Sequence, residues 1–183
     1  MKKLLLFFMS LYSFIAFGQL SENFEGTTFP PTGWAVFDNG VGPVVSWART
    51  TNTTLTRNGS VGAAYLNREA VPAGQTASDW LVTPQVAVPA SGQLQLRFFT
   101  RQTLATNEGS IYSIRVSTAS QNNIADFTSV PQTWTELTLN TTFNVYEQKI
   151  VNLNAFAGQN IYIAFVMENN NGDRWLIDDV KID

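Results

Sequence analysis

Carboxylates are the residues with the clearest capacity for chemistry in this chain. The 183 residues include no Cys and no His, and only 14 % of them are charged. Glu25 lies in the first predicted strand, whereas Asp178 and Asp179 lie in the last one. If these strands lie near each other, the three carboxylates converge and repel one another unless a divalent cation neutralises them. Because calcium binds six to eight oxygen ligands, we expect a calcium ion here, with Asn58 as a further oxygen donor.

Asp178 is the central residue of this hypothesis. Every second residue from Leu176 to Ile182 is apolar except Asp178, which places its side chain in phase with the buried face of the strand. A buried carboxylate needs a partner, because an isolated charge is costly to remove from water. The alternative interpretation is that these acids cap strands or form ion pairs with Arg57 or Arg68.

Two further acids are weaker candidates for metal ligands. Asp38 precedes Asn39 and Gly40, and we interpret this run as an Asx turn rather than as a metal-binding loop. Asp79 precedes Trp80, where it either holds a turn or joins a second metal site. For Asp79 we favour the structural role.

The missing residue types exclude most catalytic chemistry. Without His and Cys, the chain has no imidazole base, no Ser-His-Asp triad, no thiolate nucleophile and no Cys or His zinc site. Glu25 with Asp178 or Asp179 could serve as the acid pair of a glycosidase, but metal ligation explains the same residues without a cleft. We therefore expect that the protein is not an enzyme. The net charge of −3 also argues against nucleic-acid binding, which needs a basic face.

A second candidate site is a face rich in arginine. Apolar and polar residues alternate in the segments 94–101 and 112–117, so their polar positions point outward. If these segments are neighbouring strands, one outer face carries four side chains suited to binding: Arg97, Phe99, Arg101 and Arg115. Arginine binds carboxylate and sulfate groups and stacks on rings, which suits an acidic glycan or an acidic protein partner. The alternative is cross-strand pairing with acids such as Glu147, or a solvated face.

The tryptophans divide into two groups. Four of the five lie inside or beside the short motifs described below, and we expect them in the core or at its seam: Trp34, Trp47, Trp80 and Trp175. Trp134 follows Pro131-Gln132-Thr133 in a predicted loop. We therefore expect Trp134 to be the tryptophan most available to a ligand.

The elements that position these residues are predicted to be strands. The expected strands are 94–99, 112–117, 135–139, 146–153, 161–167 and 175–182. The segment 161–167 is apolar on both faces, which is typical of a central strand, and turn residues separate the segments. A short turn at 122–127 is the one helical feature that we expect. This pattern predicts an all-β fold, an antiparallel β-sandwich.

The first 18 residues are predicted to be a signal peptide. Lys2 and Lys3 precede an apolar stretch that ends at Ala16-Phe17-Gly18, with small residues at the positions that a signal peptidase reads. The stretch is shorter than the roughly 20 residues that span a bilayer, and no later segment could span one. We therefore expect an exported product in which residues 19–183 form one domain. An exported chain without disulfides favours a bacterial source.

Several short motifs follow one another across residues 19–183. They are ENFE at 22–25, FPPTGW at 29–34, SDWLVTPQ at 78–85, FAGQNIYIAF at 156–165 and LIDDV at 176–180. Their order and spacing resemble the cleaved-adhesin domain family, the module of gingipain haemagglutinin regions. This family is also grouped with choice-of-anchor J domains and is distantly similar to MAM domains.

The resemblance implies a fold, a cofactor and a role. The fold is a β-jelly roll of the galactose-binding-like or MAM-like type, with structural calcium whose acidic ligands fall at Glu25, Asp178 and Asp179. The role is that of a secreted or cell-surface bacterial adhesion module that binds a host or matrix protein or a glycan. The alternative is a non-catalytic carbohydrate-binding accessory domain of a longer exported hydrolase or peptidase. We expect a monomer.

Overall fold

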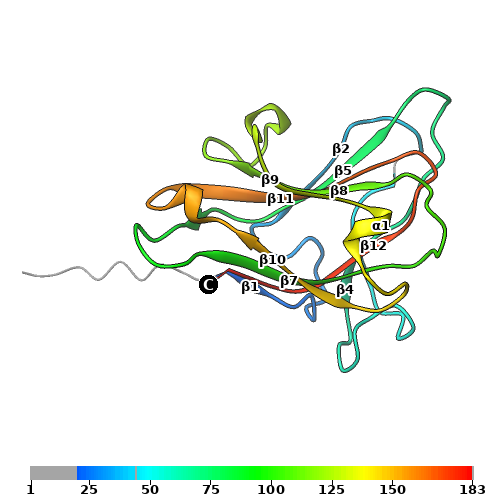
Figure 1. Ribbon diagram of the computed structural model, residues 1–183, viewed down its shortest axis with the longest axis horizontal. Helices are drawn as coiled ribbons and strands as arrows, with labels where there is room; N and C mark the ends of the chain where they lie inside the picture. The colour runs from blue at the N-terminus through cyan, green and yellow to red at the C-terminus, as the bar shows by residue number, and fades with distance from the viewer. Residues whose placement is uncertain (1–19, 44, 183) are drawn as a thin grey trace, which may run out of the picture.

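Two antiparallel β-sheets packed face to face form the core of the protein (Figure 1). The computed structural model describes residues 20–43 and 45–182. The predicted signal peptide at 1–18 lies outside the described residues. The prediction of an all-β antiparallel sandwich of jelly-roll type is confirmed.

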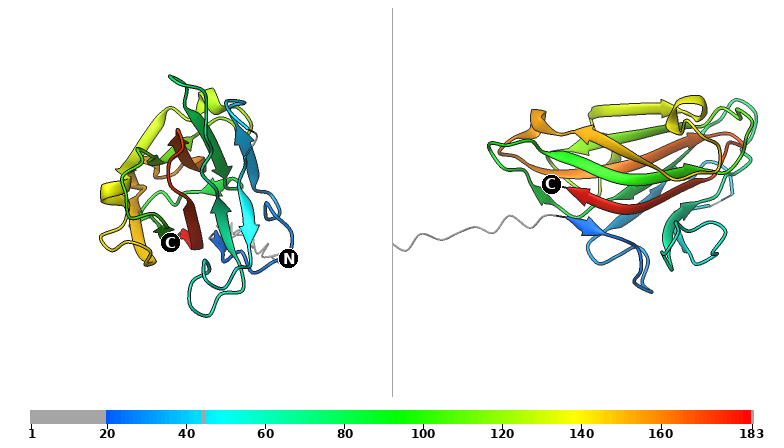
Figure 2. Two further views of the ribbon diagram at one scale, coloured as in Figure 1. Left: turned by 90° about the vertical axis from the view of Figure 1, so that its right-hand side faces the viewer. Right: turned by 60° about the horizontal axis from the view of Figure 1, so that its bottom comes forward.

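Sheet A forms the lower layer in Figure 1. Its strands run in the order β10 (Glu147–Asn152), β7 (Gln95–Gln102), β12 (Trp175–Ile182), β4 (Ala63–Leu66) and β3 (Ala48–Thr50). The short first strand, β1 (Ser21–Glu22), also pairs with β12. The right-hand view of Figure 2 shows β10, β7 and β12 side by side. The expectation that the first and last strands lie together is therefore confirmed.

Sheet B forms the upper layer in Figure 1. Its strands run in the order β2 (Ala35–Asp38), β5 (Ala77–Val82), β11 (Asn160–Asn169), β8 (Ile111–Ser117) and β9 (Ser129–Thr135), and β6 (Val86–Ala87) pairs with β11. The central position predicted for 161–167 is confirmed, since β11 pairs with both β5 and β8.

Residues of β11 pack on both faces of sheet B, which explains why this strand is apolar throughout. Ile163 and Phe165 belong to the main core between the sheets, whereas Ala164 and Val166 belong to a smaller cluster on the outer side. The outer cluster also contains Trp80, whose ring packs against Phe127 with the ring centroids 5.5 Å apart. The four tryptophans expected in the core are all buried: Trp34, Trp47, Trp80 and Trp175.

Helical structure in the described part of the chain is limited to short turns. The turn expected at 122–127 is present as the 3₁₀ turn η1 (Ile124–Asp126), and η2 (Asn154–Phe156) is a second. The strand predicted at 135–139 is wrong, because Glu136–Leu139 forms the single-turn helix α1. Within the described ranges, no helix is long and apolar enough to cross a membrane.

The physical reason for α1 is a helical rather than an alternating burial pattern. Glu136 and Leu139, three positions apart, are buried, whereas Leu137 is 71 % exposed. The Thr138 hydroxyl accepts a hydrogen bond from the Thr135 backbone at 2.9 Å, which closes the first turn. Residues three positions apart lie on the same side of a helix, so this burial pattern fits a helical turn and not a strand.

Candidate binding pocket and metal-ligating residues

The loop between β3 and β4, residues 51–62, covers part of the outer face of sheet A. Arg101 of β7 donates a hydrogen bond to the Thr54 carbonyl at 3.0 Å. The Tyr146 hydroxyl, just before β10, donates to the Leu55 carbonyl at 2.9 Å. Two strands of sheet A therefore hold the 51–62 loop in place. Most of the residues predicted to bind metal lie on this loop or face it.

Asp178 is fully buried, but it faces the 51–62 loop and not the interior of the sandwich. The β12 residues that lie in the core are Trp175, Ile177, Val180 and Ile182. The pairing of β12 with β7 shifts between Asp178 and Lys181, and Asp179 has a left-handed φ of 47°. This β-bulge reverses the alternation of the strand. The burial predicted for Asp178 is confirmed, but the face to which we assigned it is wrong.

Two hydrogen bonds satisfy the buried Asp178 carboxylate. The Ser60 hydroxyl donates to Oδ2 at 2.7 Å, and the Asp179 backbone donates to Oδ1 at 2.8 Å. Burial raises the pKa of Asp178 to about 6, although both hydrogen bonds act in the opposite direction. Removal of the carboxylate from water is therefore only partly compensated.

Asp179 forms an ion pair with an arginine, which is the alternative to calcium binding that the sequence analysis gave. Its carboxylate pairs with Arg57 of the 51–62 loop. The Arg57 guanidinium also lies over the Phe99 ring, 4.2 Å from its centroid. Asn58, next along the loop, is exposed. Arg57 thus provides positive charge where we expected a metal ion to do so.

Glu25 approaches the same loop from the other side. It follows β1, which ends at Glu22, so its predicted place within the first strand is wrong. Both carboxylate oxygens of Glu25 lie 3.0 Å from the Val61 backbone nitrogen, which donates to them. Glu25 and Asp178 therefore flank the neighbouring loop residues Val61 and Ser60.

The residues predicted to bind calcium fit such an ion only in part. Glu25 and Asp178 offer carboxylate oxygens to one loop, but Arg57 already neutralises Asp179. Within the described residues, one set of three potential metal ligands has its ligand atoms within 4.8 Å of one another: Asp38, Glu69 and Asp79. Glu25, Asp178 and Asp179 are not brought together to that degree.

The four residues predicted to share one arginine-rich face do not do so. Arg97, Phe99 and Arg101 lie on β7 of sheet A, but Arg115 lies on β8 of sheet B. Arg115 pairs with Glu168 at 2.7 Å, and its guanidinium lies 4.9 Å from the centroid of the Trp80 ring. The assumption that the two strands are neighbours is wrong, because the connection from β7 to β8 crosses from sheet A to sheet B.

Trp134 lies in β9 and not in a loop, which corrects our placement. Its ring packs edge-on against Phe98, with the ring centroids 6.1 Å apart. Trp134 is half-buried against the main core. A ligand contact by Trp134 stays a prediction.

A pocket lies beside β1, between the segment that follows β1 and the strand β3. Its volume is about 350 Å³, and residues on its wall include Glu22, Phe24, Thr27, Thr28, Phe29 and Arg49. The wall combines an acid, a guanidinium, threonine hydroxyls and the ring of Phe29, whereas the Phe24 ring is buried in the core. This volume lies in the range of ligand pockets in proteins, from about 300 to 1,000 Å³.

Hydrogen bonds to the backbone of Phe24 hold the pocket wall. Glu22 Oε1 accepts a 2.7 Å hydrogen bond from the Phe24 nitrogen, and Arg49 Nε donates one of 2.6 Å to the Phe24 carbonyl. Arg49 Nη2 also donates to the Glu25 carbonyl at 3.1 Å. The Phe24 ring contacts Phe29, with the ring centroids 6.3 Å apart. The pocket wall is therefore continuous with the segment that carries Glu25.

The sequence contains two signals for features that we did not predict. The pocket is formed largely by the ENFE and FPPTGW motifs, which we used to recognise the family and not as a binding site. Glu69 was not singled out, and Asp38 and Asp79 were considered separately. Asp38 and Asp79 are nevertheless direct partners in the pairing of β2 with β5. The Asx turn predicted at Asp38 is present, since Asp38 Oδ1 accepts a hydrogen bond from the Gly40 nitrogen.

The two antiparallel sheets define the class of a β-sandwich of jelly-roll type. The family model of the Cleaved Adhesin Domain matches residues 18–182. The chain therefore belongs to the cleaved-adhesin family, as the resemblance of its motifs indicated.

One curated relative extends this result. Hemagglutinin A of Porphyromonas gingivalis is 29 % identical to this chain over 181 residues, which cover 89 % of the chain. The match spans 7 % of the length of Hemagglutinin A. The chain is thus similar to one small part of a much longer protein.

Solved structures share the fold. The K1 cleaved adhesin domain of Lys-gingipain from Porphyromonas gingivalis W83 has a TM-score of 0.68 and 22 % identity, over 91 % of this chain and 98 % of that domain. TmCBM61, solved with β-1,4-galactotriose, has a TM-score of 0.55 and 20 % identity, over 88 % and 93 % of the two chains. At these identities the likeness shows the fold alone. The first of these neighbours is an adhesin domain, and the second is a carbohydrate-binding domain.

Proposed function

We propose that this chain is a non-catalytic adhesion module of a secreted or cell-surface bacterial protein, and that it binds a glycan. The single observation that carries the proposal is the pocket of about 350 Å³ lined by Phe24, Phe29, Glu22 and Arg49. Family membership and the fold shared with a carbohydrate-binding module support it. The predicted signal peptide supports export.

The chemistry of the pocket suits a sugar. The faces of sugar rings carry C–H groups that pack on aromatic side chains such as Phe29, and their hydroxyls both donate and accept hydrogen bonds. Glu22 offers an acceptor and Arg49 offers donors on the same wall. The hydrogen bonds to the Phe24 backbone hold this wall before any ligand arrives, which reduces the entropic cost of binding.

A glycan array with purified protein tests the proposal. Phe29→Ala removes one aromatic wall of the pocket, and we expect binding to its best glycan to weaken at least tenfold. Leu137→Ala is the matched control, because Leu137 is 71 % exposed and lies outside the pocket. Both variants must melt within a few degrees of the parent. Unchanged glycan binding by a folded Phe29→Ala variant would exclude the pocket as the binding site.

One observation favours a protein partner as the second candidate. Three large apolar side chains within ten residues of each other are strongly exposed: Leu137, Phe143 and Val145. Exposed apolar side chains that form one contiguous patch are frequent at protein interfaces. Under this alternative, Leu137→Ser would weaken binding to a host or matrix protein and leave glycan binding unchanged. A matrix-protein array run beside the glycan array distinguishes the two candidates.

We also propose that calcium stabilises the fold at the 51–62 loop. Glu25, Asp178 and Asn58 are the residues that would hold the ion, and the charge of the ion would stabilise the buried Asp178 carboxylate. Asp179 would join only if Arg57 released it. We expect chelation with EDTA to lower the melting temperature, and Asp178→Ala to remove part of that difference. A melting curve of the parent protein that EDTA leaves unchanged would contradict this proposal.

A further inference from the structure

Three asparagines of this chain are each followed by glycine, and the structure places the three pairs in different surroundings. The pairs begin at Asn39, Asn58 and Asn171. Asparagine is chemically labile, and its side chain reacts most readily with its own backbone when glycine follows, because glycine has no Cβ to obstruct the approach of the attacking nitrogen. The reaction is intramolecular, so its rate depends on whether the two groups can reach each other.

Asn58 and Gly59 form the tip of a turn in the 51–62 loop, and both are exposed. The Ser60 nitrogen closes this turn by donating to the Arg57 carbonyl at 2.9 Å. Gly59 has a left-handed φ of 89°, which is typical of the third position of a type II turn. The hydrogen bond that closes the turn therefore uses neither the Asn58 side chain nor the Gly59 nitrogen.

The two groups that would react at this turn are free. Across residues 20–43 and 45–182, no hydrogen bond engages the Asn58 side chain or the Gly59 nitrogen. A Cβ atom built on Gly59 would meet no atom within 4 Å, so the space around this residue is open. The Asn58 amide can therefore rotate toward the Gly59 nitrogen without breaking a contact.

Asn39 and Gly40 are also exposed, but hydrogen bonds hold both of their reacting groups. The Asn39 amide donates to the Thr76 carbonyl at 3.0 Å and accepts from the Val41 nitrogen at 3.1 Å. The Gly40 nitrogen, which would have to attack, donates to the Asp38 carboxylate. These hydrogen bonds must break before the Asn39 side chain can react.

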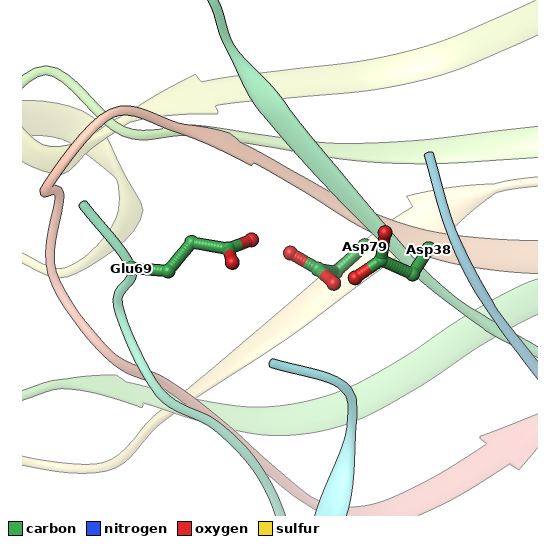
Figure 3. Close-up of side chains that lie close together, drawn as sticks. All are labelled: Asp38, Glu69 and Asp79. Atoms are coloured by element: carbon green, nitrogen blue, oxygen red, sulfur yellow. The ribbon is translucent and has the colours of Figure 1, made fainter. Parts of the chain in front are cut away.

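Negative charge near Gly40 adds to this protection. Figure 3 shows the Asp38 carboxylate beside that of Asp79, with the Glu69 carboxylate pointing toward both. The Gly40 nitrogen must lose its proton to attack, and nearby negative charge opposes that loss. The pair at Asn39 is therefore expected to react slowly although it lies on the surface.

Asn171 is exposed, but packing holds the glycine that follows it. Gly172 is buried, and a Cβ atom there would lie 1.9 Å from Ser110 Oγ and 2.9 Å from Asn169 Cβ. The Asn171 nitrogen also donates to the Glu69 carbonyl at 2.6 Å. Ring closure would swing the Gly172 nitrogen toward the Asn171 side chain, and close packing opposes this movement until the turn opens.

We propose that Asn58 is a site of spontaneous deamidation, and that the fold protects Asn39 and Asn171. The Gly59 nitrogen loses its proton to base in the solvent and attacks Cγ of Asn58. A bond forms between these two atoms, the bond from Cγ to the amide nitrogen breaks, and that nitrogen takes up a proton and leaves as ammonia. Water then opens the resulting succinimide ring at either carbonyl, which yields aspartate or isoaspartate.

Deamidation changes the loop where it contacts sheet A. Each product adds one negative charge next to Arg57, which pairs with Asp179. Isoaspartate also lengthens the main chain by a methylene group just before Ser60, whose hydroxyl donates to Asp178 at 2.7 Å. We expect these contacts to weaken and the melting temperature of the deamidated protein to fall by several degrees.

Incubation of the folded protein at pH 8 and 37 °C, followed by peptide mapping with mass spectrometry, tests the proposal. The buffer contains EDTA, so that the result does not depend on the calcium proposed at the 51–62 loop, and circular dichroism checks that the protein stays folded. The chain unfolded in guanidinium chloride is the matched control, because all three pairs are then free. We expect Asn58 to react in the folded protein within about threefold of its unfolded rate, and Asn39 and Asn171 at least tenfold more slowly than theirs.

Asn58→Gln is the variant that identifies the site. Its longer side chain would have to close a less favourable six-membered ring, so we expect the modification to disappear from this turn and the slow rates at Asn39 and Asn171 to stay unchanged. Asn58→Ser is the second variant in case Asn58→Gln does not fold, because serine carries no amide.

Two results would overturn the proposal. One is protection of Asn58 in the folded protein as strong as that of Asn39 or Asn171, and the other is reaction of either of those residues as fast as Asn58. A deamidated protein that melts at the same temperature as the parent would contradict the effect on the loop contacts.

Discussion

The Ser60 hydroxyl lies 2.7 Å from Oδ2 of the buried Asp178 and donates a hydrogen bond to it. This contact joins the 51–62 loop to β12 at the β-bulge, across 118 positions of sequence. The bulge turns Asp178 outward, and the loop covers it. The loop and the bulge therefore depend on each other.

Loss of the Ser60 hydroxyl tests this dependence. Ser60→Ala leaves Asp178 Oδ2 without that donor in a buried position, and we expect the free energy of unfolding to fall by about 1 to 3 kcal/mol. Urea unfolding at pH 7 measures the change. Ser91→Ala is the matched control, because Ser91 is exposed. Equal stability of the two variants would contradict a structural role for this contact.

The stability of the protein toward acid includes a contribution from Glu147. Burial alone would raise its pKa, but hydrogen bonds from Thr141, Thr142 and Lys149 outweigh burial and lower the pKa of Glu147. A lowered pKa means that the folded state favours the carboxylate. The resulting stability is present above the usual pKa of 4.5 and is lost as the pH falls through the lower folded-state pKa.

Glu147→Gln should therefore change how the free energy of unfolding depends on pH, and not only lower it by the same amount at every pH. At pH 7 we expect the variant to be less stable by about 1 to 3 kcal/mol, because three donors lose a charged acceptor. The difference from the parent should shrink as the pH falls from 5 to 3. Chemical unfolding at a series of pH values measures it. Parallel profiles for the two proteins would show that Glu147 does not titrate with folding.

The strands of the interior were predictable from the sequence. In β11 both faces are buried, so hydrophobicity alone marks the strand whatever its neighbours are. In β7 and β8 apolar residues alternate with polar ones, and this alternation marks each strand. The pairing partners were not predictable in this way, because alternation does not say to which sheet a strand belongs. The shared face assumed for Arg97 and Arg115 failed for that reason.

The candidate sites were less predictable, and the causes are physical. Alternation in β12 breaks at Asp179, where a left-handed residue inserts a bulge that the sequence does not signal. Glu69 lies in the loop between β4 and β5, and this loop brings it to Asp38 and Asp79 only after the sheets pack. In 136–139, residues capable of β-structure form a helical turn because Glu136 finds backbone donors at 108–110.

Trp175 depends on a polar contact within the core. Its indole nitrogen donates a 2.7 Å hydrogen bond to the Thr100 hydroxyl, and both residues are fully buried. Thr100→Val keeps the shape and removes the acceptor, so that the indole N–H is left unsatisfied. We expect a loss of about 1 to 3 kcal/mol in unfolding free energy. Thermal melting measures the change, with Thr51→Val at an exposed position as control. A Thr100→Val variant as stable as its control would show that this hydrogen bond contributes nothing.

Gly172 makes a close approach that no other residue can make. A Cβ atom at this position would lie 1.9 Å from Ser110 Oγ and 2.9 Å from Asn169 Cβ. The Ser110 hydroxyl cannot move away freely, because it accepts a 2.8 Å hydrogen bond from the Asp173 nitrogen. Gly172→Ala therefore displaces the turn after β11, and we expect a loss of about 1 to 3 kcal/mol.

Gly26→Ala provides the comparison for Gly172→Ala. A Cβ at Gly26 meets no atom within 4 Å, so the same change should alter the free energy of unfolding by less than about 0.5 kcal/mol. Asn169 Oδ1 also holds the Glu69 backbone at 3.3 Å. If the turn shifts, the Glu69 backbone shifts with it, which adds to the loss of stability in Gly172→Ala. Urea unfolding of both glycine variants measures the two changes, and a Gly172→Ala variant as stable as Gly26→Ala would contradict the steric argument.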